Sequence, residues 1–208
     1  MVTKSKKAVK KTAKRTASRK PASSAPKAPS ERMGLIEVGG KPATVIGRDV
    51  KIGQKAPRFK AQVGSWPGLN TWAEVDPLAA TKGKVRILAA MPSLNTNVCD
   101  TETRRFNREA ASLGDDICVI GVTTDLPVAQ KSWCGAAGVE RVMTVSDHMA
   151  TEFGLKYGAL IKERRWFRRS VFVVGKDDKV KYTAYLPALG VEPNYDEVLA
   201  AAKQALVE

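Results

Sequence analysis

The stretch that decides the fold is Val85–Phe106, which reads Val-Arg-Ile-Leu-Ala-Ala-Met-Pro-Ser-Leu-Asn-Thr-Asn-Val-Cys-Asp-Thr-Glu-Thr-Arg-Arg-Phe. Its first seven residues form a largely apolar run that Pro92 ends, which predicts a buried strand. From about Val98 to Leu113, apolar residues recur at spacings of four and three, which is a helical pattern. The stretch therefore predicts a strand, a loop and a helix, with Cys99 where the helix begins.

The same patterns recur outward along the chain. Apolar or alternating runs predict more strands, and a helix with Pro at its first position is predicted between two of them. Strands and helices in alternation predict an α/β domain with a mixed sheet. The elements predicted outside the first stretch are strands at Ile117–Val122, Ser170–Val174 and Val180–Tyr185, helices at Pro127–Ala136 and Tyr195–Val207, a hairpin at Leu35–Val38 and Ala43–Ile46, and a loop or edge strand at Gly64–Asp76.

Charge divides the chain into two parts. The 208 residues include 35 Lys and Arg and carry a net charge of +14, and ten of those basic residues lie in residues 1–30, which contain no acidic residue. This segment also lacks Leu, Ile and aromatic residues, so it cannot bury enough apolar surface to offset the ordering entropy of its backbone. We predict a disordered basic tail over residues 1–33 and one folded domain over residues 34–208.

The tail permits several interpretations. Its charge suits contact with nucleic acid or acidic surfaces, which salt would weaken. A solvated segment without a specific partner, an organelle transit peptide, and a chain whose true start is Met33 are the alternatives. Retention on DNA by the full chain and not by residues 34–208 would favour the first.

The rest of the composition excludes several classes of protein. No apolar run approaches the ~18 residues of a membrane span, and the N-terminus lacks the apolar core of a secretory signal peptide. We therefore expect a cytoplasmic protein without membrane contact. Three cysteines do not make a disulfide scaffold. Their spacing from His148 fits no zinc site, so we expect no metal and no cofactor.

Cys99 is the first candidate for chemistry. A helix N-terminus carries a partial positive charge that stabilises a thiolate. Thr96 lies three residues earlier, so its hydroxyl can share a ligand with the sulfur. Pro92 has no N–H and can cover the sulfur from solvent. The alternative interpretation is a buried, inert cysteine.

Cys134 lies in the next predicted helix, and Cys118 lies inside a predicted strand. Two cysteines on successive helices can form a disulfide only if their Cα atoms come within about 7 Å, which would require local unwinding. Gly135 and Gly138 weaken the second helix by about 1 kcal/mol each relative to Ala. We predict that Cys118 is a buried core residue.

We expect an arginine to supply the positive charge that favours a thiolate at Cys99. Arg169 adjoins the predicted strand 170–174, and its permanently charged guanidinium would favour a thiolate and bind an oxygen ligand. We predict that His148 is a loop or cap residue, although a Cys–His hydrolytic pair stays formally open. The other basic residues of the cluster are predicted to form a solvated face: Lys162, Arg164, Arg165 and Arg168.

Two motifs resemble those of a known family. Residues 92–99 carry the Pro-x-x-x-Thr-x-x-Cys signature of peroxiredoxins, and Asp125–Gln130 followed by Trp133–Ala136 resembles the resolving-cysteine segment of their thiol peroxidase subfamily. The resemblance covers roughly residues 34–206. Asn95 and Asn97 stand where relatives commonly have Asp and Pro, and both positions are variable ones.

The resemblance implies a thioredoxin-like fold with an N-terminal hairpin, usually as a homodimer. It implies that Cys99 attacks hydrogen peroxide and alkyl hydroperoxides, that Thr96 and Arg169 bind the peroxide, and that Pro92 shields the sulfur. It also implies that Cys134 resolves the oxidised Cys99 as a Cys99–Cys134 disulfide, which thioredoxin reduces. A thioredoxin-type oxidoreductase is the weaker alternative, because position 102 is Glu rather than Cys.

Overall fold

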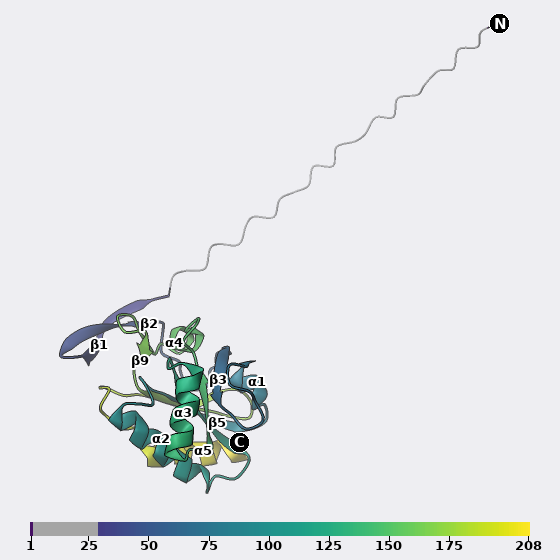
Figure 1. Cartoon of the computed structure of the whole chain (residues 1–208), viewed down its shortest axis with the longest axis vertical. Helices are drawn as coiled ribbons and strands as arrows, with labels where there is room; N and C mark the ends of the chain where they lie inside the picture. Colours follow the sequence, from purple (N-terminus) through teal and green to yellow (C-terminus); the bar gives the residue numbers. More distant parts are fainter. Residues whose placement is uncertain (2–28) are drawn as a thin grey trace.

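A mixed β-sheet of seven described strands forms the centre of the molecule (Figure 1). The computed structural model describes Met1 and residues 29–208, so most of the predicted tail lies outside the described residues. The strand order is β11-β10-β5-β6-β7-β3-β4, with β5, β6 and β7 parallel and the other neighbours antiparallel. The predicted mixed sheet is confirmed. Its strands are β3 (Ala61–Ser65), β4 (Glu74–Val75), β5 (Val85–Ala90), β6 (Ile117–Thr123), β7 (Val142–Ser146), β10 (Ser170–Val174) and β11 (Val180–Tyr185).

The predicted hairpin belongs to a second, smaller sheet with the order β1-β2-β8-β9. Gly39 and Gly40 turn the hairpin with φ values of 62° and 72°, and a two-residue turn with positive φ at both positions favours glycine. The first strand begins at Glu31, three residues before the predicted start of the domain at residue 34. The strands of this sheet are β1 (Glu31–Val38), β2 (Lys41–Ile46), β8 (Leu160–Ile161) and β9 (Trp166–Phe167).

Helices cover both faces of the large sheet because successive strand residues point to opposite sides. The helices α2 (Asn97–Ala110) and α5 (Tyr195–Val207), together with Cys134 of α3 (Pro127–Ala137), pack in one core cluster. The helix α1 (Pro77–Ala80) and the short helix α4 (Glu152–Lys156) pack in the cluster on the opposite face. No helix in the described part of the chain is long and apolar enough to cross a membrane.

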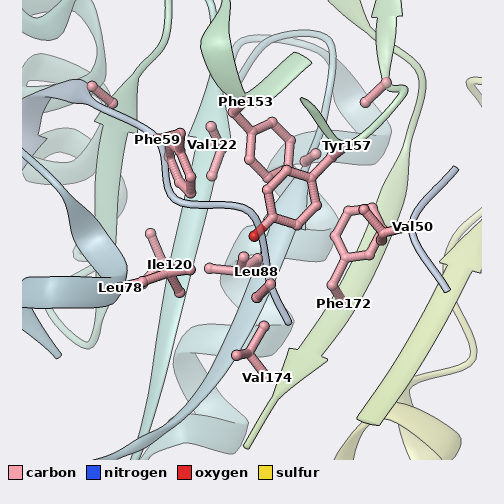
Figure 2. Packing of buried hydrophobic residues seen from close by; sticks show 14 of the residues in the cluster. Val50, Phe59, Leu78, Leu88, Ile120, Val122, Phe153, Tyr157, Phe172 and Val174 are labelled. Carbon is pink, nitrogen blue, oxygen red and sulfur yellow. The ribbon is translucent and has the colours of Figure 1, made fainter. Parts of the chain in front are cut away.

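Aromatic rings fill the second cluster (Figure 2). Phe153 stacks on Tyr157 with ring centroids 4.4 Å apart, and Phe59 meets Phe153 edge-on at 5.0 Å. Phe172 of β10 joins them from the sheet, 5.1 Å from the Tyr157 ring. These rings bury the face of the sheet away from Cys99, so this half of the core supports the site without contributing to it.

Candidate active site

The loop between β5 and α2 places Cys99 at the positive end of a helix. Thr96 is the N-cap of α2, with the extended φ and ψ of −99° and 146°, and its carbonyl accepts the first helical hydrogen bond, from Asp100 N at 2.9 Å. Cys99 is the third residue of the helix and is 0% exposed. The unpaired amides of the first turn favour negative charge on this sulfur.

Thr96 turns its hydroxyl toward the sulfur rather than toward the helix. Its Oγ1 donates to Cys99 Sγ at 2.8 Å and makes no side-chain cap to α2. An N-cap threonine ordinarily accepts an amide hydrogen of the first turn. The structure therefore brings the Thr96 hydroxyl and the Cys99 sulfur together, and a ligand shared by the two stays a prediction.

Arg169 reaches the same sulfur from the neighbouring strand. Ser170 of β10 pairs with Ala90, the last residue of β5, so Arg169 lies at the end of the sheet where the Cys99 loop begins. The guanidinium is buried, and its Nη2 donates to Cys99 Sγ at 3.2 Å and to Leu189 O at 2.9 Å. A permanent cation thus faces the candidate nucleophile.

Glu102 is a member of the site that the sequence reasoning missed. Its buried carboxylate forms an ion pair with Nη1 of Arg169. Burial raises the pKa of Glu102 to about 7, while the Arg169 guanidinium acts in the opposite direction. The available signal was its position, because residues three apart on a helix share a face and Glu102 follows Cys99 by three.

A cavity of about 430 Å³ opens beside these residues. Pro92 and Thr96 form part of its wall, and Trp166 of β9 and Leu189 form another part. Pro92 is buried and Cys99 has no exposed surface, while shielding of the sulfur by Pro92 stays a prediction. The cavity lining is largely apolar, and its remaining residues are Asn97, Val98 and Gly190.

Cys134 lies in different surroundings from Cys99. Its side chain is 2% exposed, and its Sγ lies 3.8 Å from Thr144 Oγ1 on β7. Burial raises the pKa of the Cys134 thiol, although hydrogen bonds to Thr144 and Ser65 act in the opposite direction. Both thiols are free. That a disulfide between them requires local unwinding stays a prediction from the sequence.

The remaining predictions have mixed outcomes. Cys118 is buried in the cluster on the opposite face of the sheet, and burial raises its pKa to about 11. His148 lies in the turn after β7, with Nδ1 2.9 Å from Ser146 Oγ. The predictions of a core cysteine and a loop histidine are therefore confirmed.

The prediction for Arg168 was wrong. This side chain is 4% exposed rather than solvated, donates from Nε to Gly158 O at 2.9 Å, and forms an ion pair with Asp49. Its guanidinium carbon lies 3.9 Å from the centre of the Tyr185 ring. Arg168 is buried because Asp49 pairs with its charge, Gly158 O accepts its Nε hydrogen and the Tyr185 ring packs on its flat face.

Comparison with known proteins identifies the family. The Redoxin family profile matches residues 51–199. A thiol peroxidase from Bacillus subtilis is 45% identical over 176 residues, which are 85% of this chain and 100% of that protein. A thiol peroxidase from Halalkalibacterium halodurans is 42% identical over 174 residues, 84% of this chain and 100% of that protein. The chain belongs to the thiol peroxidases of the Redoxin family. It is therefore a thiol-dependent peroxidase.

A solved structure agrees with this membership of the thiol peroxidases. The crystal structure of a peroxiredoxin-like protein from Aquifex aeolicus superposes with a TM-score of 0.71 at 32% identity. The match covers 86% of this chain and 99% of that chain. The predicted thioredoxin-like fold and the resemblance to peroxiredoxins are both confirmed.

Proposed function

We propose that the protein reduces peroxides through Cys99 as the attacking thiolate and Cys134 as the resolving thiol. One observation supports this most: at the start of α2, a single buried sulfur receives hydrogen bonds from both the Thr96 hydroxyl and the Arg169 guanidinium. Both donors stabilise negative charge, first on the thiolate and then on the oxygens of a peroxide bound beside the sulfur.

The first step is a two-electron oxidation of sulfur. The Cys99 thiolate attacks one peroxide oxygen, the O–O bond breaks, and its electron pair leaves with the other oxygen. That oxygen takes a proton and departs as water from hydrogen peroxide or as an alcohol from an alkyl hydroperoxide. Cys99 is left as a sulfenic acid. Thr96 and Arg169 hold the peroxide in this step, and Pro92 keeps water away from the sulfur.

The second and third steps return the enzyme to its starting state. Cys134 sulfur attacks the Cys99 sulfur, the S–O bond breaks, and the hydroxyl leaves as water with the thiol proton of Cys134. The resulting disulfide accepts two electrons and two protons from an external dithiol protein, for which we propose thioredoxin. The two protein thiols are thereby restored, and the thioredoxin leaves as its own disulfide.

The setting of this reaction is also part of the proposal. The substrates are hydrogen peroxide and alkyl hydroperoxides, and the apolar lining of the cavity beside Thr96 supports the second class. We place the enzyme in the cytoplasm, where a catalytic disulfide is transient. A homodimer remains a prediction from the family resemblance, and nucleic-acid contact by the basic tail remains a prediction from its charge.

The experiment is peroxide consumption with thioredoxin, thioredoxin reductase and NADPH. Cys99→Ser should show no turnover, because it lacks the nucleophile. Cys134→Ser should react once and then stall as a sulfenic acid or an intermolecular disulfide. Cys118→Ser is the matched control and should keep turning over, because its side chain lies on the opposite face of the sheet. Full activity of Cys99→Ser would refute the proposal.

A further inference from the structure

Asp125 connects the Cys99 loop to the end of β6. Its Oδ2 accepts a hydrogen bond from Leu94 N at 2.9 Å and another from Thr123 Oγ1 at 2.9 Å. Leu94 is 0% exposed and lies in the loop between Pro92 and Thr96. One carboxylate oxygen therefore fixes the backbone of the segment that presents Cys99.

Thr123 continues this connection into α3, the helix that carries Cys134. Its Oγ1 accepts a hydrogen bond from Gln130 Nε2 at 2.9 Å, and the same Nε2 donates to Val145 O at 3.0 Å. Gln130 is 0% exposed and precedes Cys134 by four residues, so both side chains lie on the same face of α3. The hydrogen-bonded series Leu94–Asp125–Thr123–Gln130 thus joins the two cysteine segments.

The helix α3 packs closely against the backbone of β3 at Gly64. A Cβ at Gly64 of β3 would lie 2.6 Å from Gln130 Cβ and 2.9 Å from Thr144 Oγ1. The side chain of Gln130 therefore packs directly on the Gly64 backbone. Its hydrogen bonds to Thr123 and Val145 fix α3 in this position. In this position Cys134 Sγ lies 3.8 Å from Thr144 Oγ1 on β7.

We propose that Asp125 and Gln130 are positioning residues that latch both cysteine segments in the reduced conformation. The inference rests on the proposed function, because disulfide formation requires both segments to leave that conformation. While these hydrogen bonds are intact, the bond from Leu94 N to Asp125 keeps the Cys99 loop in the geometry that reacts with peroxide. When the latch opens, the loop and α3 become free to unwind, and Cys134 can reach the sulfenic acid.

The latch has a kinetic signature that general destabilisation lacks. Removing it loosens the reactive loop, so the reaction of Cys99 with peroxide becomes slower. It also raises the fraction of unwound protein, so formation of the disulfide becomes faster. A variant that merely folds poorly would lose rate in both steps.

The test uses the reduced full chain, mixed rapidly with hydrogen peroxide in the absence of any reductant. Acid quenching, thiol blocking and mass spectrometry then follow the sulfenic acid, the Cys99–Cys134 disulfide and the over-oxidised sulfinic acid. Asp125→Ala should form the disulfide about tenfold faster than wild type, because it loses a charge-assisted hydrogen bond of the closed state. Its sulfinic acid fraction at high peroxide should fall correspondingly.

Two further variants make the result specific. Asp125→Asn keeps an oxygen that can accept from Leu94 N but loses the charge, so its disulfide should form at a rate between those of wild type and Asp125→Ala. Asp76→Ala is the matched control, because the Asp76 carboxylate likewise accepts a backbone amide hydrogen, from Ala79 N at 3.0 Å, but at the start of α1. This control should leave both rates unchanged.

The possible results distinguish failure of the latch from failure of the proposed function. Disulfide formation in Asp125→Ala that is no faster than in wild type would overturn the latch and leave the proposed function intact. The latch is also overturned if Asp76→Ala accelerates the step as much as Asp125→Ala does. Absence of a Cys99–Cys134 disulfide in oxidised wild type would overturn the proposed function and the latch together.

Discussion

Replacing Thr96 by Val separates the chemistry at Cys99 from the stability of α2. Valine keeps the branched shape of threonine and removes only the hydroxyl. That hydroxyl lies 2.8 Å from Cys99 Sγ and 3.1 Å from an exposed second acceptor, Ser93 O, and it does not cap the helix. The substitution should therefore weaken the reaction with peroxide while leaving the fold nearly as stable as before.

The size of the effect follows from the kind of hydrogen bond that is lost. A hydrogen bond to a charged group contributes about 1.5–3 kcal/mol, which corresponds to roughly a tenfold to 100-fold loss in kcat/KM for peroxide. An N-cap side chain that does bond the helix contributes about 1 kcal/mol to stability. Because Thr96 does not make that bond, Thr96→Val should lower the free energy of unfolding by less than about 0.5 kcal/mol.

The assay combines stopped-flow oxidation by hydrogen peroxide with urea unfolding of the reduced protein. Thr96→Ser restores a hydroxyl and should recover most of the rate. Asn194→Ala is the opposite control, because the Asn194 side chain does cap α5, accepting from Glu197 N at 3.3 Å. It should lose about 1 kcal/mol of stability and keep its rate. The reasoning is refuted if Thr96→Val reacts as fast as wild type, or if it is destabilised as much as Asn194→Ala.

Three further predictions concern the frame around the site. Phe153→Ala should lower the free energy of unfolding by about 3–5 kcal/mol in urea titrations, because the 0% exposed ring packs in the aromatic cluster; a loss below about 1 kcal/mol would contradict that packing. Burial raises the pKa of Asp147 to about 7 from its ordinary value of 3.8. The protonated carboxyl therefore contributes its full stability below about pH 4, and this stability is lost as the pH rises through 7. Relative to Asp147→Asn, wild type should therefore lose about 2–3 kcal/mol of unfolding free energy between about pH 5 and pH 8, and parallel pH profiles would exclude the shift. Gly64→Ala should destabilise the protein by about 1–3 kcal/mol, since its Cβ would lie 2.6 Å from Gln130 Cβ, and thermal unfolding unchanged from wild type would show that α3 moves aside freely.

Local patterns made much of the fold predictable from the sequence. The strands β5, β6 and β10 are largely apolar runs, and α5 spans the predicted residues Tyr195–Val207. The strand β7 and the helix α4, which has five residues, were not predicted, because short segments leave little periodicity to detect. The two-residue strands β8 and β9 depend on pairing partners that lie far away in the sequence.

Among the site residues, too, contacts that are local in sequence were predictable and distant ones were not. Thr96 and Cys99 were predictable as a pair because one helix start contains both. The Glu102–Arg169 ion pair joins residues 67 positions apart, so only the folded sheet brings them together. The burial of Arg168 likewise depends on Asp49 and Tyr185, which the local basic cluster gave no reason to consider.

The small sheet has a consequence for how such an enzyme diversifies. Trp166, which lines the cavity, belongs to β9 and packs against the cluster formed by Ile36, Val45 and Ile161. One wall of this cavity thus packs against the N-terminal hairpin, which holds neither cysteine. Mutations in the hairpin can therefore reshape this cavity while α2, which carries Cys99, stays untouched. The shape of the cavity and the surroundings of Cys99 can therefore change independently in this architecture.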